Sequence, residues 1–126
     1  MGEDHQMGST SGDNVAVIRR AFDADESMLA ENAAWHFLSP VPELVAHFEG
    51  RDAIVEEWPN MLHELTGGTF TKRLVDVWPV GDDLVVAHVE VAMTIAGEHH
   101  QGSSVVVYRL ADGVVSEGFD IPSALI

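Results

Sequence analysis

Apolar and polar positions recur in two different ways along this chain. In the first half they follow the period of a helix: Val15, Ile18 and Phe22 share one face of a segment near the N-terminus. A second short helix carrying Met28 and Leu29 is expected directly after it. In the second half the apolar positions alternate with the period of a β-strand. Helices and strands in separate stretches are typical of an α+β protein.

Residues 33–38 read as a short strand between the first helices and the next one. Alternation along this strand puts Trp35 and Phe37 on one face and His36 on the other. Two closely spaced prolines follow and end the strand, because proline cannot donate a hydrogen bond to a sheet. We expect a loop from there to Gly50.

A third helix is predicted over residues 51–65. Pro59 lies inside its apolar pattern and should kink or split the helix. The pair Gly67 and Gly68 ends it. The apolar stripe of this helix consists of Ile54, Trp58, Leu62 and Leu65.

The second half of the chain predicts an antiparallel meander. Gly102 suggests a bulge in one of its strands. The helices should then pack on one face of a curved sheet. The expected strands cover residues 69–80, 84–96, 99–110 and 114–121. One face of the second strand carries Val85, Ala87, Val89, Val91 and Met93.

Length and composition indicate one globular domain. The chain has 126 residues, of which 46% are hydrophobic. A chain of this size buries a core without metal or disulfide cross-links. Residues 1–13 are polar and rich in Gly and Ser, so we expect a flexible leader. A single domain over residues 14–126 should follow it.

The chain is strongly acidic, with 6 Lys and Arg residues against 21 Asp and Glu residues and a formal net charge of −15. Nucleic acids and anionic membranes select basic surfaces, so neither is an expected partner. The absence of cysteine excludes disulfides and thiol nucleophiles. With no bilayer-length apolar run and no visible signal peptide, a cytoplasmic location is expected. The sequence also lacks a phosphate loop or dinucleotide fingerprint, so we predict no cofactor.

Several segments resemble, in order and spacing, the SnoaL-like branch of the nuclear transport factor 2-like superfamily. They are AFDADE, ENAAWHFLSPVP, FEGRDAI, VWPVGDDLVVAHVEV and VVVYRLADGVVSEGFDIPSAL. The resemblance implies a cone in which a curved antiparallel sheet wraps around the N-terminal helices and leaves one apolar cavity. It also implies a homodimer through the outer face of the sheet. Members include isomerases, cyclases, hydrolases, dehydratases and non-catalytic binders, so the fold does not fix a reaction.

The chain departs from the ketosteroid isomerases of this superfamily at each position that their reaction uses. In a simple alignment the base position holds Phe37, the tyrosine position holds Val17 and the neutral aspartic acid position holds Val106. That isomerase mechanism is therefore not expected. The Asp–Arg–Asp set of limonene epoxide hydrolase is incomplete as well, although Arg109 and Asp120 are present.

Asp120, in the GFDIP segment of the last expected strand, is the best candidate for acid–base chemistry. It resembles the acid that polyketide-cyclase-like members place at this point. Inside an apolar cone its charged form would be disfavoured, and its pKa would rise toward the working pH. The alternative is a structural carboxylate that caps a turn or a helix. Tyr108 is a second candidate, as a hydrogen-bond donor to a ligand oxygen.

Histidines supply further candidates. His88 and Glu90 share one face of a strand, so the pair either orients an imidazole for proton transfer or lies on the outer face of the sheet. His47 falls near the expected mouth of the cone and is a candidate ligand contact. His36 and His63 are expected to point away from the cavity.

The neighbours His99 and His100 point to opposite faces of a strand, so no metal site is expected there. Aromatic residues are candidates for the core and for the wall of an apolar pocket, which overlap in this fold. The candidate ligand-binding aromatic residues are Trp35, Phe37, Trp58, Trp78 and Phe119.

Three functions remain open at this point. The first is an enzyme that isomerises, cyclises, dehydrates or hydrolyses a small hydrophobic molecule by cofactor-independent acid–base catalysis. The second is a non-catalytic module that binds a ligand in the same pocket. The third is a dimerisation or interaction domain whose cavity is filled. An enzyme predicts an open cavity that contains Asp120 with a raised pKa, whereas an interaction domain predicts bulky side chains filling the cone.

Overall fold

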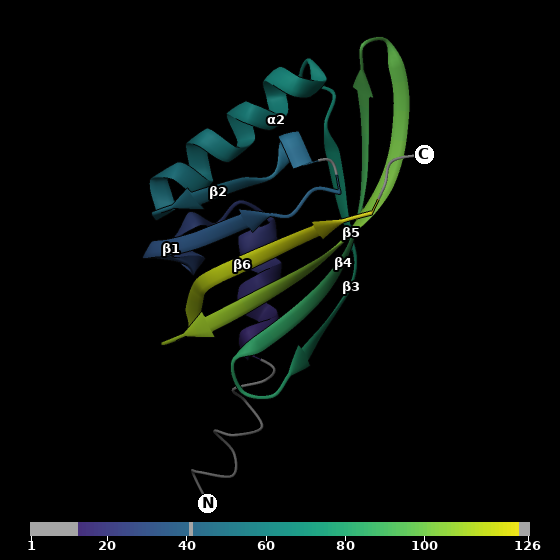
Figure 1. Cartoon of the computed structure of the whole chain (residues 1–126). Helices are drawn as coiled ribbons and strands as arrows, with labels where there is room; N and C mark the ends of the chain where they lie inside the picture. The colour runs from purple at the N-terminus through teal and green to yellow at the C-terminus, as the bar shows by residue number, and fades with distance from the viewer. Residues whose placement is uncertain (1–12, 41, 124–126) are drawn as a thin grey trace, which may run out of the picture.

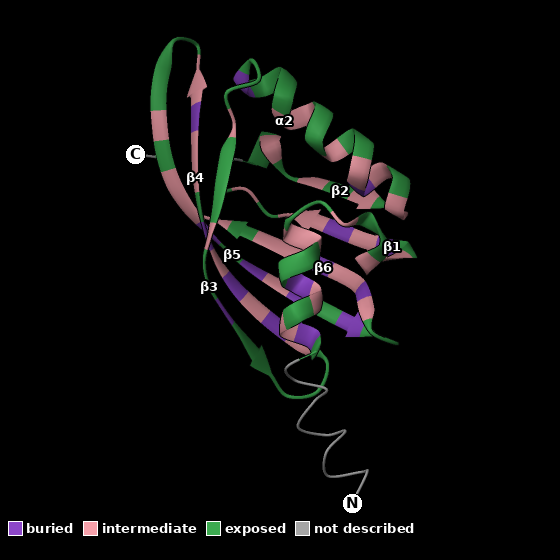
Figure 2. Ribbon diagram, turned by 180° about the vertical axis from the view of Figure 1, so that it is seen from behind, coloured by how far each residue is buried: buried purple, intermediate pink, exposed green. Residues whose placement is uncertain are grey.

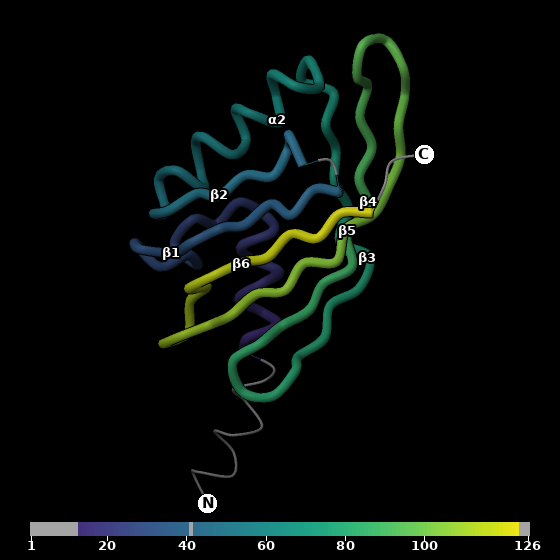
Figure 3. Tube along the Cα trace, viewed as in Figure 1, coloured from purple at the N-terminus to yellow at the C-terminus, as the bar shows by residue number. Residues whose placement is uncertain are grey.

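A computed structural model of the chain describes residues 13–40 and 42–123. Within these residues six strands form one curved sheet in the order β2-β1-β6-β5-β4-β3 (Figures 1 and 3). This confirms the α+β class. The predicted leader lies outside the described residues, apart from Asp13, which is helical. The strands are β1 (Leu29–Phe37), β2 (Ala46–Glu49), β3 (Thr71–Val80), β4 (Leu84–Ile95), β5 (Glu98–Ala111) and β6 (Val114–Pro122).

A helix over residues 13–22 crosses one face of the sheet, which we call the inner face (Figure 2). Ile18 of this helix is fully buried, as the helical pattern predicts. It packs into a core with Val85 of β4 and Val115 of β6, which are also fully buried. The helix therefore holds the middle of the sheet by the apolar stripe that its sequence encodes.

The prediction of a second short helix is wrong. Only a single 3₁₀ turn, η1 (Glu26–Met28), forms, and Leu29 already belongs to β1. Asp25 caps this turn by accepting a hydrogen bond from the backbone N–H of Ser27. The alternating residues that follow favour a strand over a longer helix.

The predicted loop up to Gly50 contains two short elements, the 3₁₀ turn η2 (Pro42–Leu44) and strand β2. Strand β2 is an edge strand that pairs antiparallel with β1. Its alternation spans only four residues, so the sequence signal is weak and the partner strand decides. The pairing of β1 with β6 is parallel, which the expected meander did not include.

The predicted bulge at Gly102 is wrong, because this residue pairs in regular register with Val91. Irregularities in β3 and β5 fall instead between Leu74 and Asp76 and between Arg109 and Leu110. Bulges are set by the partner strand as much as by glycine.

The predicted third helix is helical over residues 51–66, and Pro59 lies inside it. The segment directly before the proline is a π-helix, η3 (Ala53–Glu57), which continues into α2 (Trp58–Thr66). Proline has no N–H, so it cannot bond to the carbonyl four residues back, and the wider π-turn accommodates this loss. Gly67 ends α2 in the left-handed conformation with φ 61°.

Candidate functional site

A cavity of about 380 Å³ lies between the inner face of the sheet, helix 13–22 and α2. A volume of this size suits a small organic molecule. Its wall is mainly aliphatic and aromatic, with a few polar groups. The lining residues include Phe22, Trp35, Trp58, Lys72, Ser104, Val106, Tyr108 and Asp120.

Strand alternation explains why the polar groups meet. Ser104, Val106 and Tyr108 are spaced by two on β5, so all three face inward. Asp120 of β6 pairs directly with Val106 and therefore shares that face. Lys72 also lines this cavity, and it lies on β3, the strand at one edge of the sheet.

Asp120 is the acid of the cavity. Burial raises its pKa to about 6 from 3.8, while the Ser104 side chain and the Lys72 charge act in the opposite direction. Its Oδ1 atom is buried and has no hydrogen-bond partner. A carboxyl group in this state changes its protonation near neutral pH and has a lone pair free for a ligand.

Tyr108 and Trp35 form the aromatic end of the cavity, with ring centroids 5.8 Å apart. Burial raises the pKa of Tyr108, and the Asp120 charge adds to this effect, so Tyr108 stays a neutral phenol. The indole Nε1 of Trp35 is buried without a hydrogen-bond partner. Among the described residues, Trp35 Nε1 and Asp120 Oδ1 are the two buried side-chain polar atoms without a hydrogen-bond partner. Both residues line the cavity.

Lys72 is the polar residue of the cavity that the sequence analysis missed. Lys72 is exposed, and its Nζ atom lies 4.5 Å from the centroid of the Phe22 ring. Partial burial lowers its pKa, while the charges of Asp120 and Asp23 act in the opposite direction. The available signal was its spacing of two from the inward-facing Leu74 in the same strand.

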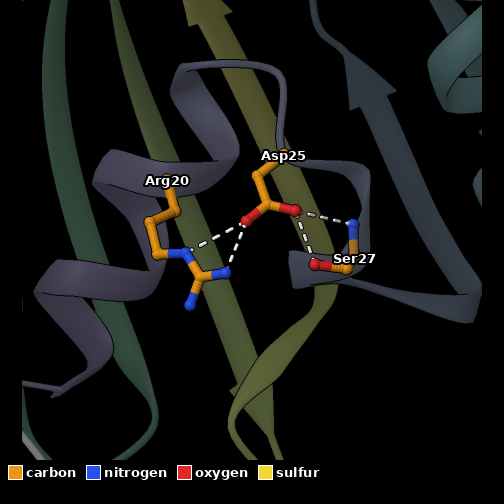
Figure 4. A network of polar contacts seen from close by, with 3 residues as sticks. All are labelled: Arg20, Asp25 and Ser27. Atoms are coloured by element: carbon orange, nitrogen blue, oxygen red, sulfur yellow. Dashed lines mark hydrogen bonds and ion pairs between the residues drawn. The ribbon is translucent and has the colours of Figure 1, made fainter.

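Polar contacts fix one rim of the cavity (Figure 4). Asp25 forms an ion pair with Arg20 at 2.7 Å and accepts hydrogen bonds from both the N–H and the hydroxyl of Ser27. The Ser27 and Arg20 contacts lower the pKa of Asp25. Asp25 therefore holds the turn after helix 13–22 in place and is engaged in structural contacts.

Phe37 and Trp58 were both predicted to contact a ligand. Trp58 lines the cavity. Phe37 packs behind it, with ring centroids 4.6 Å apart, and is not among the lining residues. Phe48 of β2 supports Trp58 from a second side at 5.5 Å.

His88 and Trp78 do not reach the cavity. The neighbours of His88, Ala87 and Val89, are the buried residues of β4 that face inward, so His88 faces outward. Trp78 pairs with Val86 on that outer face and is 42% exposed. Strand parity had separated His88 from Val85, Ala87 and Val89 correctly, but only the packed helices identify the inner face.

His47 and Phe119 also lie on the outer face, around His36. The ring of His36 stacks on Phe119 at 4.8 Å, and its two nitrogens lie 2.8 Å from His47 Nδ1 and 2.7 Å from a Glu117 carboxylate oxygen. His36 points away from the cavity, as predicted, and Glu117 lies on the same outer face. His63, expected to be solvated, is exposed, yet it also lines the cavity rim beside Gly68.

Within the described part of the chain, His, Asp and Glu side chains form no cluster of three or more that could hold a metal ion. No helix among those residues is long and apolar enough to cross a membrane.

Comparison with known proteins assigns this architecture. The profile of a SnoaL-like domain matches residues 11–118. No match is found among curated proteins. Among solved structures, Bal32a from a soil-derived mobile gene cassette is 23% identical, with a TM-score of 0.77 over 90% of this chain and 91% of Bal32a.

Two further structures have the same fold. An NTF2-like protein from Burkholderia thailandensis E264 is 17% identical, with a TM-score of 0.76 over 87% of this chain and 90% of its own. TerC, co-crystallised with polyporic acid, is 19% identical, with a TM-score of 0.73 over 88% of this chain and 92% of its own. The fold is therefore NTF2-like.

Proposed function

Because this chain belongs to the SnoaL-like domain family, we propose that its cavity binds a small hydrophobic molecule and that Asp120 exchanges a proton with it. The reaction would be an isomerisation, cyclisation, dehydration or hydrolysis that needs no cofactor. Asp120, with Tyr108 as a neutral hydrogen-bond donor, is the proposed acid–base group. TerC, which has the same fold, was co-crystallised with polyporic acid.

One observation carries this proposal: the Asp120 Oδ1 atom is buried in an apolar cavity without a hydrogen-bond partner. Burying a polar group without a partner costs free energy, so its retention favours a use in ligand contact. With a pKa of about 6, Asp120 would act as a base above that pH and as an acid below it.

A non-catalytic binding module is the second candidate. Val106, at the position aligned with the neutral aspartic acid of ketosteroid isomerases, lines the cavity as an aliphatic residue. The cavity therefore has no second acid at that point to share the chemistry. Binding without turnover needs only the apolar wall and one or two polar contacts.

Hydrogen–deuterium exchange separates the two candidates. A panel of enolisable aryl ketones and β-diketones is incubated with the protein in D₂O, and loss of the α-proton is followed by NMR. We expect catalysed exchange whose rate rises with pH through about 6 and then levels, because the base form of Asp120 is needed. In Asp120→Asn the rate should fall by about 100-fold or more.

Ser116→Ala, on the same strand outside the cavity, is the matched control and should exchange at the native rate. If compounds of the panel raise the melting temperature equally in the native protein and in Asp120→Asn, and no exchange is catalysed, the chain is a binding module. The acid–base proposal is then abandoned.

A further inference from the structure

Lys72 is the only lysine of this chain. It is one of 6 positively charged residues in a protein with a net charge of −15, and it lines the cavity. Lysine side chains commonly cover apolar surface with their stem and keep the ammonium near water, and Lys72 is both exposed and part of the cavity wall. Arg73, the next residue, is ion-paired with Glu90 at the surface.

Lys72 is exposed to solvent, and its ammonium lies against the aromatic wall of the cavity without being neutralised. Its Nζ atom lies over the Phe22 ring at 4.5 Å, a cation–π arrangement that favours the charged form. Among the described residues no carboxylate lies within 4.0 Å of it, although Asp120 and Asp23 are near enough to act on its pKa. The ammonium therefore keeps hydrogen-bond donors that no group of residues 13–40 or 42–123 occupies.

Asp120 and Lys72 face the same cavity with a gap between them. The Asp120 charge raises the pKa of Lys72 and the Lys72 charge lowers the pKa of Asp120, yet no ion pair joins the two side chains. Opposite charges that line one cavity without forming an ion pair are both available to a ligand group bound there. Because the surroundings are apolar, a contact there would be stronger than the same contact in water.

Resting on the function proposed above, we propose that Lys72 is a ligand-binding residue and that the ligand is an oxygen acid on an apolar body. The oxygen that Lys72 contacts is a carboxylate or phenolate, or a carbonyl oxygen that becomes an enolate. In the catalysed case, the Asp120 carboxylate takes the proton from the α-carbon. The C–H electron pair moves into the carbonyl group, and the oxygen that gains the charge accepts a hydrogen bond from Lys72. No oxidant or cofactor is required, and protonation at carbon reverses the charge movement.

A pair of probes that differ only in charge tests this inference. Binding of 2-naphthoate and of its neutral isostere 2-naphthamide is measured by isothermal titration calorimetry at pH 7.5 and at pH 5.5. We expect the native protein to prefer the naphthoate by about tenfold, the difference between a charge-assisted and a neutral hydrogen bond. Affinity for the naphthoate should be higher at pH 5.5, where Asp120 is mostly protonated and does not repel it.

The variants give each residue its own signature. Lys72→Met should abolish the preference for the naphthoate, and Lys72→Arg should keep most of it. The matched control Arg73→Met removes the same charge from the adjacent surface position and should leave the preference intact. Asp120→Asn should remove the pH dependence and retain the preference.

The single lysine also permits a direct measurement. Its Nζ and Cε resonances are unambiguous in the NMR spectrum, and they should shift on addition of naphthoate and hardly on addition of naphthamide. Circular dichroism melting of Lys72→Met establishes that the variant folds. If this variant does not fold, the NMR shifts in the native protein alone decide.

Equal affinity for the two probes in the native protein, unaltered in Lys72→Met, overturns the inference, and so does the failure of both to bind. Catalysed exchange of ketones that depends on Asp120 would still stand in either case. Conversely, a Lys72-dependent preference without any exchange supports the inference and leaves acid–base catalysis as the proposal that failed.

Discussion

At the scale of the residue, the burial of Asp120 that suits its proposed role in proton transfer also costs folding free energy when the carboxyl group ionises. The folded protein must bury a carboxyl group whose ionised form prefers water, and its pKa is raised to about 6 from 3.8. The folded state therefore binds this proton more tightly than the unfolded chain does. The neutral form of Asp120 stabilises the folded protein at low pH. This contribution to the free energy of unfolding declines as the pH rises from 3.8 to 6, and above pH 6 the free energy of unfolding no longer changes through this group.

The substitution Asp120→Asn should therefore make the protein more stable, relative to the native chain, above pH 6 than below it. The advantage over the native chain is expected to grow by about 1.4 kcal/mol between pH 5 and pH 8, because the carboxylate must ionise in the native protein. Urea unfolding of both proteins at the two pH values measures it. An advantage that shrinks with rising pH would mean that Asp120 is stabilised as an anion in the folded protein.

At the scale of the element, the close contact between β6 and β1 shapes the floor of the cavity. Gly118 of β6 pairs with Trp35 of β1. A Cβ atom placed on Gly118 would lie 2.2 Å from the Trp35 ring. Glycine at this position therefore leaves room for the Trp35 indole, which packs against Gly118 and lines the cavity.

Substitution of Gly118 by alanine should force Trp35 out of its place. We expect a loss of about 2–3 kcal/mol in the free energy of unfolding and a weaker ligand affinity, because the indole cannot move without disturbing the core. Urea unfolding and calorimetry with 2-naphthoate measure the two effects. Ser116→Ala, which removes one hydrogen bond to the Arg109 carbonyl, should cost less than about 1 kcal/mol. Equal stability of both variants would contradict the steric argument.

At the scale of the whole molecule, the outer sheet face carries exposed apolar side chains. Trp78, Val105 and Ile121 lie on it and are each more than 40% exposed. Helices lie on the inner face of the sheet (Figure 2), whereas no described helix or strand crosses the outer face, which is turned toward the viewer in Figure 1. We propose that a second copy packs on it, as the family resemblance implies.

Val105→Glu should convert such a dimer to a monomer, because the new carboxylate would be buried at the contact. Light scattering after size-exclusion chromatography measures the mass. Each copy carries a net charge of −15, so the dimer should also strengthen with salt, which screens the repulsion. Leu65→Glu, an equal change on the exposed side of α2, should leave the mass unchanged. A native protein that elutes as a monomer at high salt and high concentration would refute this assembly.

The sequence by itself determined the periodicities of this protein. The alternation in residues 84–95 separated the inward Val85, Ala87 and Val89 from the outward His88, and the helical spacing of Ile18 and Phe22 gave the helix that covers them. It also marked Asp120, because the GFDIP segment resembles the one in which polyketide-cyclase-like members carry an acid. These features depend on local geometry, which the chain encodes within a few residues.

Only the tertiary structure decided which face encloses the cavity and which residues meet there. The pairing of β1 with β6 brings Trp35 beside Gly118, and the curvature of the sheet brings Lys72 of β3 toward Asp120 of β6. The same packing turned His47, His88, Trp78 and Phe119 to the outer face. Contacts between strands far apart in sequence depend on sheet order and helix packing, and no local pattern specifies either.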